Sequence, residues 1–183
     1  MLAYLVLLFA VLSRFLPHAL HGIGLNFTAV GGGLLFFGAR RSPWQASVAA
    51  GVMAITDVCL TRFVYDYPFH VQAYLLTWGW YAGVCLLGSG LLRQISAPRV
   101  IVAVFCSSTS FFLLSNFDVW LQGGLYSRNA AGLGACFAAA LPFYANDLVS
   151  TGLTATVLFA FPVVAGKLVT TWQQSLGQEH PFV

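Results

Sequence analysis

The segment Pro98–Leu121, PRVIVAVFCSSTSFFLLSNFDVWL, decides the fold class of this chain. It is apolar and longer than the ~20 residues that an α-helix needs to cross a bilayer. The whole chain of 183 residues has the same character, because 59% of it is hydrophobic and it holds only eight Lys and Arg and five Asp and Glu. A soluble domain covers itself with far more charge. We therefore expect an all-α, polytopic integral membrane protein.

Five further apolar stretches accompany this segment. They run over Leu2–Leu16, Thr28–Ala39, Pro43–Leu60, His70–Leu92 and Leu148–Lys167. With Pro98–Leu121 they predict six transmembrane helices. Thr28–Ala39 is too short for an upright span, so we expect neighbouring helices or a thinned membrane surface to cover its ends. The runs form one domain, residues 1–172, and residues 173–183 form a short polar tail.

The apolar piece Ala130–Phe143 is also short, and it contains Pro142 near its end. Because proline disrupts helices, we predict a short re-entrant or interfacial helix that returns to its own side. Asn146 then caps the last transmembrane helix, and Asp147 lies in its first turn. In the alternative, this piece spans as well, which makes seven helices and moves the C-terminus to the other side.

The basic residues predict the orientation. With six helices, one side carries the N-terminus and five of the eight Lys and Arg, namely Arg40, Arg41, Arg93, Arg99 and Lys167. The positive-inside rule then places both termini in the cytoplasm. Four of the five acidic residues fall at or near the outer face: Asp57, Asp66, Asp118 and Asp147. This gathering of acids predicts a polar binding site near the outer face.

Asp57 is the most informative acid, because it lies inside the apolar run Pro43–Leu60. A lone ionised carboxylate at the centre of a membrane helix costs about 2.5–3.5 kcal/mol, so Asp57 needs a partner. Arg62, five residues later, is a local candidate. An Asp–Arg pair of purely structural use and a carboxylate in a ligand pocket are both open readings.

Two other places combine polar or aromatic groups with apolar surroundings. Asn116 and Asp118 enter the end of the apolar run Pro98–Leu121, where they either join helices or stand at the mouth of a substrate pocket. Trp78 lies beside Gly79 and Gly83, whose spacing lets another backbone approach. Packing is the default role of Trp78, and an aromatic wall for a planar ligand is the alternative.

Patterns typical of metal or catalytic sites are missing. The four cysteines form no C-x-x-C pair, and His18 and His21 have no third ligand nearby in the sequence. No H-E-x-x-H or serine-protease context occurs. The positive charges are scattered, which excludes a nucleic-acid-binding stripe. We therefore expect a protein that is not an enzyme, with no metal, no cofactor and no nucleic-acid partner.

Several passages resemble a known family. Arg14–His18, Asn26–Val30 and Asp57, followed by Ser107–Trp120 and Ala131–Phe143, resemble a bacterial family of unknown function catalogued as putative transport proteins. That family in turn resembles the substrate-binding S components of energy-coupling factor (ECF) transporters. The turn Leu141–Leu148, LPFYANDL, is similar to the P-F-x-x-[GN]-D-L turn that opens the last helix of several S components.

The resemblance implies a six-helix protein in the inner (plasma) membrane of a bacterium that captures a vitamin or similar metabolite near its outer face. The positions that match the ligand-binding loops of S components are Asn26, Thr28, Arg62, Tyr65, Arg128 and Asn129, with Asp57, Asn116, Asp118 and Asp147 beneath them. It also implies a transmembrane coupling subunit with an ATPase pair as partner.

Two functions from different classes follow as hypotheses. The first is a membrane-embedded subunit that binds a small molecule for uptake. The second is a non-catalytic accessory subunit of a larger membrane complex, in which small-residue faces pack against partner proteins.

Overall fold

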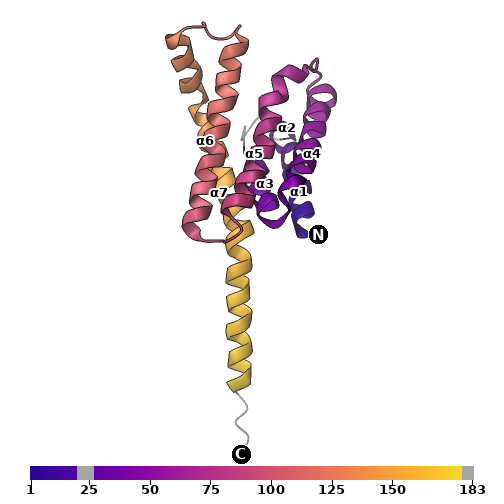
Figure 1. Ribbon diagram of the computed structural model, residues 1–183, viewed down its shortest axis with the longest axis vertical. Coiled ribbons are helices and arrows are strands. Elements are labelled where there is room, and N and C mark those ends of the chain that lie inside the picture. The colour runs from indigo at the N-terminus through magenta and orange to yellow at the C-terminus, as the bar shows by residue number, and fades with distance from the viewer. Residues whose placement is uncertain (20–26, 179–183) are drawn as a thin grey trace, which may run out of the picture.

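The computed structural model describes residues 1–19 and 27–178, and every regular element within them is helical. The prediction of an all-α protein is confirmed. The helices are α1 (Leu2–Ser13), α2 (Leu16–Ala19), α3 (Val30–Arg40), α4 (Ala46–Cys59), α5 (Leu75–Leu91), α6 (Ala97–Gln122) and α7 (Ala130–Gln178). Short 3-10 turns at Pro43–Gln45 and Val71–Tyr74 precede α4 and α5, and a π-helical turn at Leu60–Val64 follows α4. Figure 1 shows α1, α3, α4 and α5 grouped beside a long α6–α7 hairpin.

Helix α3 is the core of the bundle. All residues from Val30 to Gly38 are buried, because α1, α5 and α7 pack around them. The contact with α5 is a backbone contact: a Cβ added at Gly38 would lie 1.9 Å from the carbonyl oxygen of Cys85, and one added at Gly88 would lie 2.3 Å from that of Leu35. The prediction that neighbours cover this short segment is confirmed.

The glycines that permit this approach are not the ones that the sequence indicated. Cβ atoms added at Gly79 or Gly83 on α5 would meet no atom within 4 Å. The prediction of a close backbone approach at this G-x-x-x-G spacing is therefore wrong. Spacing alone does not say which face of a helix meets a neighbour, and α5 meets α3 through Gly88 instead.

Helix α7 corrects the prediction of a re-entrant helix. It is continuous over 49 residues and runs through both Pro142 and Pro162. Each proline removes one backbone hydrogen bond, and a long helix with neighbouring support tolerates that loss. Consequently neither the short helix before the last span nor the cap at Asn146 exists. At ~1.5 Å per residue α7 is about 74 Å long, and its C-terminal part projects beyond the bundle (Figure 1).

The count of spans is also corrected. Among the described residues, three helical segments are long and apolar enough to cross a membrane: Pro43–Val64, Ala97–Gln122 and Ala130–Pro162. Six spans are not supported, because α1, α3 and α5 have 12, 11 and 17 residues, fewer than the ~20 of an upright span. Apolar runs in a sequence overestimate helix length, since they include residues that fold as turns, such as Val71–Tyr74 before α5.

Candidate ligand-binding site

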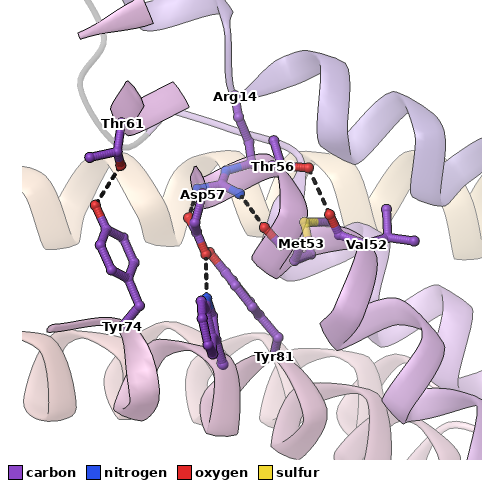
Figure 2. Close-up of polar contacts among 9 residues, drawn as sticks. Arg14, Val52, Met53, Thr56, Asp57, Thr61, Tyr74 and Tyr81 are labelled. Carbon is purple, nitrogen blue, oxygen red and sulfur yellow. Dashed lines mark hydrogen bonds and ion pairs between the residues drawn. The ribbon is translucent and has the colours of Figure 1, made fainter. Parts of the chain in front are cut away.

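Asp57 lies at the centre of a polar network between α1, α4 and α5. Its carboxylate forms an ion pair with Arg14, and the two side chains are 3% and 14% exposed. The Trp78 indole donates a hydrogen bond to Oδ2 at 2.9 Å, and the Tyr81 hydroxyl lies 3.4 Å from Oδ1. Arg14 also donates to the carbonyl oxygen of Met53 at 3.2 Å (Figure 2). Several donors thus satisfy this buried carboxylate.

Arg14, rather than Arg62, is the partner that Asp57 requires. Arg62 lies in the π-helical turn that follows α4, where its side chain is exposed, and Asp57 is buried. Trp78, considered from the sequence as a ligand wall, uses its indole N–H on Asp57. The pair and its hydrogen bonds have the geometry of a structural junction between three helices.

Two small cavities lie next to this network and share part of their walls. The first, about 150 Å³, opens between α6 and α7. The second, about 120 Å³, is lined by Arg14, Thr28 and Tyr81 among others. Phe111 of α6 and Asp147 of α7 line both cavities. Asp147 therefore stands at their junction, beside the Arg14–Asp57 pair.

Asp147 differs from Asp57 in having an unsatisfied oxygen. It is 6% exposed, and its Oδ2 atom has no hydrogen-bond partner in the described part of the chain. The hydroxyl of Ser108, which lines the first cavity with Asp147, interacts with the Asp147 carboxylate. Buried polar atoms are nearly always hydrogen-bonded, so the unsatisfied oxygen of Asp147 beside a cavity indicates a place for a polar ligand.

The charge of the first cavity is one-sided. Asp147 is the sole charged residue among the described residues that line it. The rest of the wall combines Phe111, Phe112, Phe143 and Tyr144 with the polar side chains of Ser108, Ser115 and Asn116. In the second cavity, the positive charge of Arg14 is already paired with Asp57. The field at the junction is therefore that of a single carboxylate facing aromatic rings.

The sequence predicts that Asp147 lies in the first turn of the last helix, and this prediction is wrong. It is not in the first turn of a helix, because α7 begins at Ala130 and continues through it. Asp147 faces α6 from within α7, where burial rather than a helix N-terminus sets its surroundings. Its location at or near the outer face stays a prediction.

The structure brings together some of the other residues selected from the sequence. Thr28 lines the second cavity and Asn116 the first, although the Asn116 amide donates to the carbonyl of Phe112 in its own helix at 2.7 Å. Asn26 lies outside the described residues. The remaining ones lie away from both cavities: Arg62, Tyr65, Asp118, Arg128 and Asn129.

Most of the residues that lie away from both cavities make contacts with nearby residues instead. Asp118 accepts a hydrogen bond from Gln122 at 2.6 Å. Arg128 donates a hydrogen bond to the carbonyl oxygen of Gln122 at 3.3 Å, and the Asn129 side chain accepts one from the backbone N–H of Gly132 at 2.8 Å. These bonds build the turn between α6 and α7. Tyr65 packs edge-on against His18, with ring centroids 5.6 Å apart.

Two residues of the site were not selected from the sequence. Arg14 is charged and close to the apolar run that forms α1, which is a signal that it needs a partner. Ser108 belongs to the run Ser107–Ser110, expected to bond back to its own helix carbonyls. Ser110 does so at 2.9 Å, whereas the Ser107 hydroxyl has no partner among the described residues and the Ser108 hydroxyl interacts with the Asp147 carboxylate. No signal in the sequence distinguishes these serines.

The comparisons with known proteins identify a family. A model described as "Family of unknown function (DUF6580)" matches residues 1–173. No curated protein and no solved structure matches the chain.

Proposed function

We propose that this chain, which belongs to the family of unknown function DUF6580, is a membrane-embedded subunit that binds a small polar molecule for uptake. The proposal is of a binding protein rather than an enzyme. Its site is the junction of the two cavities, and the unsatisfied carboxylate oxygen of Asp147 is the observation that carries it.

Asp147 and Asp57 differ in how the protein meets the free-energy cost of burying a carboxylate. An ionisable residue inside a membrane helix costs about 2.5–3.5 kcal/mol unless something pairs with it. The protein meets that cost at Asp57 with Arg14, Trp78 and Tyr81. At Asp147, which lines a cavity, one buried carboxylate oxygen has no hydrogen bond from the described residues. A group that destabilises the bundle without a partner is typical of a binding site.

The membrane arrangement is part of the proposal. We expect α1, α3 and α5 to lie within the bilayer beside the three longer helices, because α3 is enclosed by its neighbours and short helices persist where protein covers their ends. The resemblance to S components supports six membrane-embedded helices in a bacterial plasma membrane, with both termini in the cytoplasm and a ligand that is a vitamin or similar metabolite.

The test is the purification of the full chain in mild detergent from its own membranes. We expect a retained small molecule in mass spectra of the denatured protein, and a thermal shift with members of a vitamin and metabolite panel. Asp147→Asn should lose both signals, while Asp118→Asn, a carboxylate bonded to Gln122 away from the cavities, should keep them. Absence of any retained molecule and of any shift would reject the proposal.

A second candidate is favoured by one observation, the length of α7. The helix continues past the bundle in Figure 1, and a projecting helix offers a surface for a partner subunit. The partner would be a coupling subunit with an ATPase pair, or another membrane complex in which this chain is an accessory subunit. Native gels of solubilised membranes test this, because truncation after Pro162 should abolish co-migration with the partner while the remaining chain still folds.

A further inference from the structure

We infer that the ligand of the junction is a small organic ammonium ion, whose charged nitrogen binds the unpaired carboxylate oxygen of Asp147. This inference rests on the proposed function and specifies the chemistry of the same site. Its basis is the cavity between α6 and α7, its single carboxylate and its aromatic wall.

The negative charge of the first cavity excludes an anionic ligand. Asp147 is 6% exposed and has an unpaired Oδ2, and it is the one charged side chain among the described residues around the first cavity. A carboxylate ligand would place two like charges together, and the nearby Arg14 is already bound by Asp57. A cationic nitrogen instead neutralises Asp147, and the Ser108 oxygen can accept one of its hydrogens while its own hydroxyl interacts with the carboxylate.

The wall favours an organic cation over an inorganic one. Divalent metal ions require several ligands around a small volume, and no three His, Cys, Asp or Glu among the described residues are grouped so that they could hold one. Phe111, Phe112 and Tyr144 instead line a space of about 150 Å³, the size of a cavity that holds a benzene molecule. Aromatic faces attract ammonium groups through their quadrupoles. The ligand therefore combines an ammonium group with a small apolar body.

Binding to the purified full chain tests the inference with three probes of similar shape: isobutylammonium, isobutanol and isobutyrate. Ligand-observed NMR detects binding at the weak affinities expected of such small molecules. A charge-assisted hydrogen bond contributes about 1.5–3 kcal/mol, so isobutylammonium should bind about tenfold more tightly than the other two, or better. Sodium chloride at equal ionic strength is the control for salt.

The variants give a second readout, because the unfolding temperature is measured without any probe. Asp147→Asn keeps the shape and removes the charge, so it should abolish the preference for isobutylammonium and raise the unfolding temperature of the unliganded protein. Asp118→Asn should change neither. A structural role for Asp147 predicts the opposite, a lower unfolding temperature in Asp147→Asn.

The outcomes separate this inference from the proposed function. Equal binding of the three probes, an unchanged preference in Asp147→Asn, or a full effect from sodium alone would overturn the ammonium ligand. If the metabolite panel then yields only neutral or anionic ligands that depend on the cavity, the binding function stands without this inference. If no molecule binds in either experiment, both are rejected.

Discussion

The guanidinium of Arg14, at the C-terminal end of α1, forms an ion pair with the carboxylate of Asp57, which lies 43 residues later in α4. Trp78 and Tyr81 of α5 add their own contacts to the same carboxylate. One buried acid therefore holds three helices together. Asp57 is satisfied, whereas the buried carboxylate of Asp147 has an oxygen without a hydrogen bond from the described residues.

Loss of one partner of this pair should be strongly destabilising. Arg14→Met leaves Asp57 buried without its counter-charge, and breaking a buried pair costs about 3–5 kcal/mol. The double variant Arg14→Met/Asp57→Leu should recover much of that loss, since no charge is left uncompensated. Reversible unfolding in detergent measures the free energy of unfolding of the wild type, of the two single variants and of the double variant. Arg62→Met, which alters an exposed residue, is the control, and additive effects of the two single changes would contradict the prediction.

The contact between α3 and α5 predicts a difference between glycines. Gly38→Ala would place a methyl group 1.9 Å from the carbonyl oxygen of Cys85, and backbone cannot move aside as a side chain can. We expect this variant to lose monodispersity on size exclusion and to unfold at a much lower temperature. Gly83→Ala, where nothing lies within 4 Å, should behave as wild type. Equal tolerance of the two would show that α3 and α5 do not cross at Gly38.

Two hydroxyl groups in the bundle should differ in how much they contribute to the free energy of unfolding. The hydroxyls of Thr61 and Tyr74 share a hydrogen bond of 2.7 Å (Figure 2), so Tyr74→Phe should lower the free energy of unfolding by about 0.5–1.5 kcal/mol. The Ser107 hydroxyl has no partner in the described part of the chain, and Ser107→Ala should cost nothing measurable. Denaturant titration of both variants checks this, and a larger loss in Ser107→Ala would contradict it.

Continuity of α7 predicts the sides on which its ends lie. In a background without the four native cysteines, Ser127→Cys precedes α7 and Gln173→Cys lies near its end. A membrane-impermeant maleimide should label the two positions from opposite sides of the membrane, because one helix that contains the candidate span Ala130–Pro162 separates them. Labelling of both from the same side would restore a re-entrant helix before Pro142.

The site could be predicted from the sequence only in part. Asp57, Thr28, Asn116 and Asp147 were selected from charge, position or family resemblance, and the structure places all four in or beside the cavities. The prediction that Asp147 lies in the first turn of a helix was wrong, because Pro142 does not end a helix here. A proline costs one hydrogen bond, and the packing of α7 against α6 and α3 compensates for that loss.

Local chemistry in the chain was enough to establish its helical class and its apolar surroundings, because both depend on composition and on the length of runs such as Pro98–Leu121. Contacts between residues of different helices could not be predicted from composition and run length. Arg14 meets Asp57, and Ser108 meets the Asp147 cavity, through the packing of helices that are distant in the chain. Sequence spacing reports the direction of a side chain on its own helix, whereas the packed bundle determines which of two buried acids is paired and which faces a cavity.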